Sequence, residues 1–307
     1  MNFFNILFSV CTGTEIFPKL LDISLRRSIF HFILLTIACA FFILGGRAFP
    51  LWHSIDSTCN ALSIEFGSLQ IDNDGILPSK SPEKPRELFL LDNLRVNYSP
   101  SEQDELKLLD SDNSKFGVAW TPGILCAWMK LNSSDYLFMP LIYPEKNITI
   151  PRAPMTKSEG VEYIKKYASA KGPFNFLLSK VNFSAMKPAL FFYISAIIFM
   201  AALFKIIVSA VLFTSIFAVI YSLVGRDALS SLPVKKLFVI GTYTAFPCIV
   251  IASFFPALEL PFLDYQTVFL ITFLFYLFIV FNRIQKSLNP KPEKKPDKAD
   301  GDDEGIF

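Results

Sequence analysis

Residues that perform catalysis or hold metal ions are scarce in this chain, and they lack the spacing that such sites need. The 307 residues include 2 histidines, His31 and His53, and these form no HExxH motif. The 5 cysteines form no CxxC pair, and neither a GxSxG nucleophile motif nor a glycine-rich phosphate loop occurs. We therefore expect no catalytic site, no metal site and no cofactor, and packing is the default role of both histidines.

A strong charge of either sign is also lacking. Lysine and arginine number 29, aspartate and glutamate 27, and the formal net charge is +2. A chain without a strong positive field has no general attraction for nucleic acid, so we expect no nucleic-acid partner. The carboxylates between residues 72 and 112 lie in turn-like polar stretches, which favours a solvated surface. The stretch DNDGILPSKSPE departs from the pattern of a calcium loop.

Hydrophobic residues, by contrast, make up 52% of the chain and gather in blocks. Blocks of about 20 apolar residues are long enough to cross a bilayer, so the sequence predicts a multi-pass membrane protein. Aromatic and basic residues before the first block predict an amphipathic segment at the membrane interface, against the alternative of a disordered lead-in. In chain order, we predict an interfacial segment 1–28, span 1 at 29–49, an extracytoplasmic domain 50–186, a long span 2 at 187–224, a cytoplasmic loop 225–236, span 3 at 237–257, an external loop 258–262, span 4 at 263–282 and a disordered cytoplasmic tail 283–307.

The segment between spans 1 and 2 has the pattern of a water-soluble α+β domain. Dense turn residues separate short alternating or β-branched runs, which predicts strands. The expected strands lie within 61–71, 87–98, 116–131 and 136–143. The stretch TKSEGVEYIKKYASA predicts one helix, with Thr156 and Glu159 as its capping box. The expected fold is therefore a four-span α-helical membrane protein with an α+β domain inserted between spans 1 and 2.

The apolar stretch 187–224 contains a single charge, Lys205, and could form one span or two. Cationic flanks of short loops face the cytoplasm. One span places Lys235 and Lys236 inside together with both termini, whereas two spans would place them outside, so we favour one span. Such a helix would be roughly 55 Å long, well beyond the bilayer core of about 30 Å. Pro188 suits its start.

Lys205 and Pro247 are the polar and structural irregularities within the apolar blocks. If Lys205 lies near the outer boundary, its ammonium group can extend to the headgroups; contact within the bundle and a transport or proton role are the alternatives. Pro247 removes a backbone hydrogen bond in the middle of span 3 and should kink it, either as a static packing feature or as a flexing element. Thr242, Tyr243 and Thr244 could satisfy the freed carbonyls.

Cys59 and Cys126 are the two cysteines of the predicted external domain, and an oxidising compartment would favour a disulfide between them. The alternative is a pair of buried thiols. Four N-x-S/T sequons also fall in this domain and would accept glycans in a eukaryotic host. They begin at Asn97, Asn132, Asn147 and Asn182.

The order of these parts resembles an uncharacterised bacterial membrane family of unknown function, some of whose members are labelled maltodextrin-utilisation proteins. The similar stretches are FFNILFSVCTGTEIFPKLLDISLRRSIFHFILL, IEFGSLQIDNDGIL and MTKSEGVEYIKKY. KKLFVIGTYTAFPCIVIASFF is also similar to the related Yip-type membrane domains. The tail and the external cysteine pair depart from the family pattern. The resemblance implies a bacterial inner membrane and no catalytic residue.

These observations predict a non-enzymatic protein of the plasma (cytoplasmic) membrane. Its external domain would bind a partner or ligand, or organise a membrane assembly. The expected partners are the lipid bilayer and another membrane or envelope protein. The alternative is a transporter component or accessory subunit for solute uptake, with Lys205 and the Pro247 kink in its working region.

The predicted topology can be tested with single cysteines introduced at Pro100 and Ser230 in a background without other reactive thiols. A membrane-impermeant maleimide applied to intact cells should label position 100 and spare position 230, because the first lies outside and the second inside. Labelling of position 230 from outside would contradict the four-span prediction.

Overall fold

The chain divides into two compact units. The computed structural model describes residues 2–90, 94–100, 114–146, 148–224, 232–260 and 263–288. The helical unit comprises residues 1–47 and 196–307, and the α+β unit comprises residues 48–195. The helical unit is therefore built from the two ends of the chain, and the α+β unit from one continuous segment.

Four helices in the described residues are long and apolar enough to cross a membrane, as the sequence predicts. Two of them have 42 residues each, and both contribute residues to both units. The other two have 24 residues each and belong to the helical unit. The four are α3 (Leu25–Phe66), α5 (Phe183–Val224), α6 (Val234–Ala257) and α7 (Tyr265–Leu288). The direction in which each would cross a membrane stays a prediction.

Helix α6 is the centre of the helical unit. In its most apolar 18-residue window, 78% of the residues are buried, against 22% for α5, so α5 exposes a long apolar surface suited to lipid. Tyr243 and Phe246 of α6 and Phe269 of α7 are among its largest fully buried side chains. At Gly241, an added Cβ would press on Thr214, so a small residue allows α5 to approach α6 closely.

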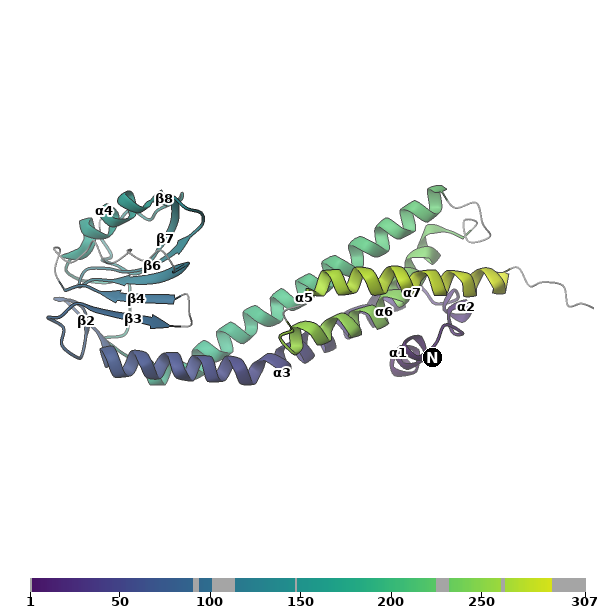
Figure 1. Cartoon of the computed structure of the whole chain (residues 1–307), viewed down its shortest axis with the longest axis horizontal. Helices are drawn as coiled ribbons and strands as arrows, with labels where there is room; N and C mark the ends of the chain where they lie inside the picture. Colours follow the sequence, from purple (N-terminus) through teal and green to yellow (C-terminus); the bar gives the residue numbers. More distant parts are fainter. Residues whose placement is uncertain are drawn as a thin grey trace, which may run out of the picture. The chain divides into compact units, whose positions relative to one another are not determined.

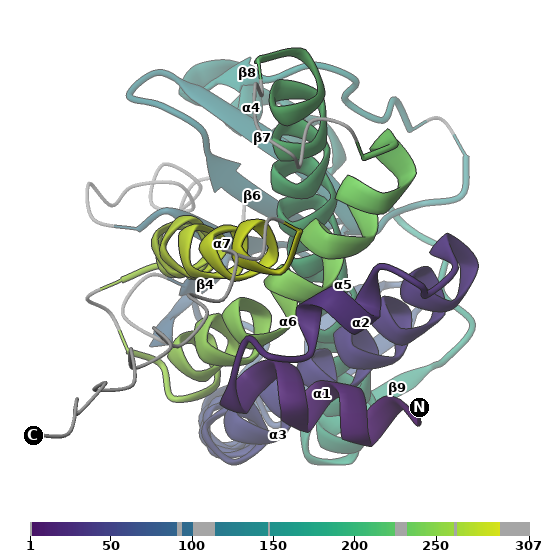
Figure 2. The same cartoon turned by 90° about the vertical axis from the view of Figure 1, so that its right-hand side faces the viewer.

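The N-terminal segment forms two short helices, α1 (Phe3–Thr12) and α2 (Phe17–Leu20), which pack on α6 and α7 (Figure 2). The buried side chains of α1 are Ile6 and Val10. Phe4 and Phe8 are mostly exposed on another face of the same helix. The predicted amphipathic helix therefore forms. One of its apolar faces packs against the protein and another is exposed, as expected of a helix at a membrane interface.

Two sheets form the α+β unit (Figure 1). The smaller has the order β2-β1-β9 and the larger the order β3-β4-β5-β6-β7-β8, antiparallel throughout except for the parallel pair β4 and β5. The strands are β1 (Ser68–Asp72), β2 (Gly75–Pro78), β3 (Arg86–Leu90), β4 (Leu94–Tyr98), β5 (Phe116–Trp120), β6 (Leu125–Lys130), β7 (Asp135–Ile142), β8 (Met155–Thr156) and β9 (Lys180–Asn182).

The larger sheet buries parts of both faces. One face packs on helix α4 (Lys157–Ala168), which contributes Tyr163, Ile164 and Tyr167 to a core with Trp128 and Phe138. Part of the other face packs on the smaller sheet in a second core. The predicted capping box begins α4: Thr156 Oγ1 accepts a hydrogen bond from the backbone NH of Glu159, and the Glu159 carboxylate accepts one from the NH of Thr156.

Several predicted boundaries are wrong. Residues 61–66 belong to α3 and not to a strand, because Ile55, Cys59, Leu62 and Phe66 continue an inward-facing helical stripe. Gly67, with φ 79°, then ends the helix, and β1 begins at Ser68.

Two helix ends also differ from prediction. Helix α5 begins at Phe183, where the Asn182 side chain accepts a hydrogen bond from the NH of Ser184, so Pro188 lies inside the helix and not at its start. Helix α7 continues to Leu288, so residues 283–288 are helical and not part of a disordered tail. Residues 289–307 and most of the loop 225–236 lie outside the described residues.

The contact of α4 with the sheet predicts the effect of Gly160→Ala. Replacing glycine by alanine inside a helix normally stabilises it by up to about 1 kcal/mol. Here an added Cβ would overlap the Phe138 ring, so overpacking should outweigh that gain and lower the unfolding free energy by about 1–3 kcal/mol. Denaturant unfolding followed by the fluorescence of buried Trp120 and Trp128 measures the change.

The exposed substitution Glu162→Ala, on the same helix, is the matched control and should leave the midpoint nearly unchanged. A Gly160→Ala variant as stable as the original chain would contradict the packing argument.

Candidate functional site

A row of exposed apolar side chains crosses three strands of the larger sheet. Strand register places Phe116 of β5 opposite Met129 of β6, and Met129 opposite Leu137 of β7. Met139 and Leu141 follow at alternate positions of β7, which points them to the same face. The exposed fractions of these five side chains range from 39% for Leu137 and Leu141 to 58% for Met139. We call these five residues the apolar sheet face.

The smaller sheet covers only one end of this side of the larger sheet, and the apolar sheet face lies exposed at the other end. Phe116 and Trp120 lie four residues apart on the same face of β5. Trp120 is buried in the core with Phe66 and Tyr98, and its indole NH donates a hydrogen bond to the carbonyl of Ile76. Phe116 lies beyond this cover and is 40% exposed. The alternation of β5 thus anchors the sheet at one end and presents apolar surface at the other.

Strand β7 forms most of the open side. It pairs with β8 only at Asp135 and Tyr136, and it contains Pro140, a residue typical of edge strands. Proline limits the addition of a further strand at such an edge. The accessible feature of this strand is therefore the row of side chains on its face.

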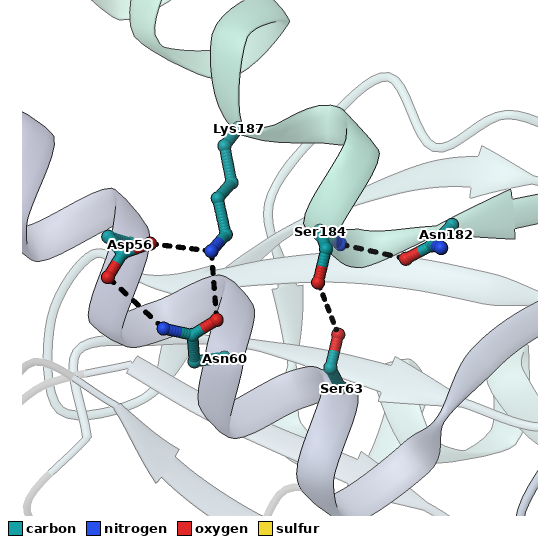
Figure 3. Close-up of polar contacts among 6 residues, drawn as sticks. All are labelled: Asp56, Asn60, Ser63, Asn182, Ser184 and Lys187. Carbon is teal, nitrogen blue, oxygen red and sulfur yellow. Dashed lines mark hydrogen bonds and ion pairs between the residues drawn. The ribbon is translucent and has the colours of Figure 1, made fainter.

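A second feature of the α+β unit is polar, and it joins the end of α3 to the start of α5 (Figure 3). The Lys187 ammonium lies 2.5 Å from a carboxylate oxygen of Asp56 and donates a hydrogen bond of 2.8 Å to the side-chain oxygen of Asn60. The Asn60 amide in turn donates to Asp56 at 3.1 Å. One turn further on, the hydroxyls of Ser63 and Ser184 lie 3.2 Å apart. We call the group Asp56, Asn60 and Lys187 the helix clamp.

The helix clamp follows from helical spacing. Asp56 and Asn60 are four residues apart and so share one face of α3. Near the clamp, Trp52 and Phe191 pack edge to face with ring centroids 5.5 Å apart. Sequence reasoning missed this site because it ended the first helix before residue 50. A carboxylate and an amide four residues apart are also too common to single out.

The predicted disulfide between Cys59 and Cys126 is wrong, since both cysteines are free and buried. Cys126 faces α4 in the core that contains Trp128 and Tyr163. The end of α3 packs on the opposite side of the sheet, where the Phe66 and Trp120 rings lie 5.3 Å apart. Burial raises the pKa of the Cys126 thiol to about 12, so it is a poor nucleophile at neutral pH.

Lys205 lies on α5 at the level of the connection between α6 and α7. Its ammonium is 5.9 Å from the centroid of the Tyr265 ring, at the first residue of α7. Asp264 precedes that helix, and hydrogen bonds from Thr267, then from the backbone, hold its pKa below the usual value, with a further contribution from Lys205. This position supports the interpretation that Lys205 marks a membrane boundary. It also brings Lys205 near the acidic residues Glu259 and Asp264, a proximity that was not predicted from the sequence.

Pro247 is buried within α6, which continues as one helix to Ala257. Proline at this position leaves the Tyr243 carbonyl without its helical donor. Thr242 and Thr244 do not replace it, because their hydroxyls donate to the carbonyls of Phe238 and Ile240. The expectation that these threonines satisfy the freed carbonyl is therefore wrong, and the kink itself stays a prediction.

The remaining polar residues of interest are separate from one another. His31 is buried in the helical unit, and its Nδ1 lies 2.9 Å from the Tyr243 hydroxyl, whereas His53 is exposed on α3. Among the sequons, Asn97 is 4% exposed and Asn182 caps α5. Asn147 lies outside the described residues. A group of three or more metal-ligating side chains does not occur in the described part of the chain.

Comparisons with protein families, with curated proteins and with solved structures find no match to this chain. The family resemblance noted in the sequence therefore stays a prediction.

The helix clamp predicts non-additive effects of Asp56→Asn and Lys187→Gln. Each single change leaves the other charge without its partner and should lower the midpoint of urea unfolding, followed by tryptophan fluorescence. The double variant should be no less stable than the worse single variant, because the second change removes a group that has already lost its partner. Additive losses would show that the two side chains act independently.

Proposed function

We propose that this protein is a membrane-anchored binding protein whose α+β unit docks a partner protein on the apolar sheet face. The observation that carries the proposal is the continuous row Phe116, Met129 and Leu137, extended by Met139 and Leu141. Exposed apolar patches of this kind mark interaction sites more often than scattered apolar residues do. The four apolar helices support the membrane anchor.

The composition of the face favours a protein as the occupant. Methionine and aromatic residues are enriched in the buried centres of protein–protein interfaces, and methionine adapts its shape to a partner. Met129 and Met139 lie on neighbouring strands, with Phe116 at the end of the row.

The absence of catalytic motifs in the sequence favours binding over an enzymatic activity. The transporter alternative would need Lys205 and Pro247 to act together. Within the described ranges, no hydrogen bond or ion pair connects these two residues, so this alternative has less support.

The proposal predicts the result of photo-crosslinking from within the sheet face. A benzophenone amino acid placed at position 139 of the full-length protein, in its native membranes, should give one discrete adduct with another protein. The matched control is position 177, whose leucine is fully exposed in the same unit but lies off the sheet. It should give no such adduct.

A second test keeps a probe on the same face and changes the side chains beside it. Leu137→Asn together with Met139→Asn should abolish the adduct formed from a probe at position 129, because the buried centre of an interface carries most of its binding energy. Equal adducts from positions 139 and 177 would contradict the proposal. So would a product of twice the chain mass, which would indicate self-association, or crosslinking to lipid alone.

A further inference from the structure

The helical unit contains a cavity of about 540 Å³ at the connected ends of α6 and α7. Four charged side chains line it: Arg47 from α3, Lys205 from α5, and Glu259 and Asp264 from the connection between α6 and α7. Tyr265 also lines it, and the rest of the wall is apolar, with Ile197 and Ile198 among its residues. A cavity of this size and character is typical of a small-molecule or headgroup site.

The two cations of the cavity have donors left for a ligand. Arg47 uses Nε to donate a hydrogen bond of 2.8 Å to the carbonyl of Pro256, at the end of α6. This bond fixes the guanidinium plane and leaves its terminal nitrogens without a hydrogen-bond partner among the described residues. Lys205 contacts the face of the Tyr265 ring, and within the described ranges it forms no hydrogen bond or ion pair. A phosphate group suits both side chains.

Tyr265 contributes the aromatic part of the lining. Its side chain is 3% exposed, and the centroid of its ring lies 5.9 Å from the Lys205 ammonium. An aromatic face attracts a cation without using its hydrogen-bond donors. The ring therefore keeps the Lys205 ammonium at the cavity with its donors available to a ligand.

The carboxylates narrow the ligand class. Glu259 and Asp264 balance Lys205 and Arg47, so the formal charge of the lining is zero. Both acids are exposed, and Asp264 already accepts hydrogen bonds from the NH groups of Gln266 and Thr267. A ligand that carries both a phosphate and a primary ammonium group matches the two cations and the two acids together. The two carboxylates would repel a purely anionic ligand.

The position of the cavity points to a lipid as the source of that ligand. Helices α6 and α7 have 24 residues each, about 36 Å at 1.5 Å per residue, slightly more than the hydrocarbon core of about 30 Å. Their connected ends therefore fall at headgroup depth, and exposed Ile197 on α5 offers apolar surface to an acyl chain. We propose that this cavity binds the headgroup of a phosphatidylethanolamine-type lipid.

The test uses the full-length protein in detergent and measures lipid binding by native mass spectrometry. The probes are phosphatidylethanolamine, phosphatidylglycerol and diacylglycerol with the same acyl chains. We expect phosphatidylethanolamine to bind at least about tenfold more tightly than the other two, which lack the ammonium or the whole phosphate headgroup. Equal binding of the three lipids to the unaltered protein would overturn the proposal, whatever any variant does.

Variants then locate the site. Lys205→Met should weaken phosphatidylethanolamine binding about tenfold, whereas Lys235→Met, an exposed lysine at the start of α6, should leave it unchanged. If Lys205→Met does not fold, Arg47→Gln removes the other cation of the lining and should weaken binding several-fold. Unchanged binding in a folded Lys205 or Arg47 variant would place the lipid elsewhere and overturn the assignment.

A soluble headgroup separates lipid from free phosphate compounds. Glycerophosphoethanolamine lacks acyl chains and should bind far more weakly than the lipid. Binding as tight as that of the lipid would overturn the lipid as the source.

Discussion

The length of the helices relative to a bilayer is the constraint on which the rest of this structure depends. A hydrocarbon core of about 30 Å accommodates about 20 helical residues. The 24 residues of α6 and of α7 match that length, whereas α3 and α5 have 42 each, about 63 Å at 1.5 Å per residue. Both long helices therefore have several turns that a bilayer cannot hold, and their surplus residues 48–66 and 183–195 belong to the α+β unit.

Surplus turns outside lipid need a different kind of stabilisation from turns within it. Inside a bilayer, apolar side chains can face lipid, and α5 exposes most of its apolar window. In the α+β unit, the same two helices are joined by the charged and amide side chains of Asp56, Asn60 and Lys187. The change from apolar exposure to polar pairing along one continuous helix agrees with the change of solvent that the sequence predicts.

Most of the architecture could be predicted from the sequence, because long apolar runs and turn-rich segments carry strong signals. The capping box of Thr156 and Glu159 was also readable, since it depends on residues three apart. The end of α3 could not be predicted, because ALSIEF fits both an alternating strand and a helical stripe. Only the packing of Phe66 in the core decides between the two. The apolar sheet face and the cavity near Lys205 depend on strand register and helix packing, which no local pattern encodes.

The division of the chain into units has a consequence for the order of events during synthesis. Residues 48–195 are contiguous, so the α+β unit can fold once residue 195 has left the ribosome. The helical unit cannot do so, because Ile6 and Val10 of α1 pack against α6, more than two hundred residues later. The first helices must therefore wait in the membrane, without their native neighbours, until the last part of the chain has been made.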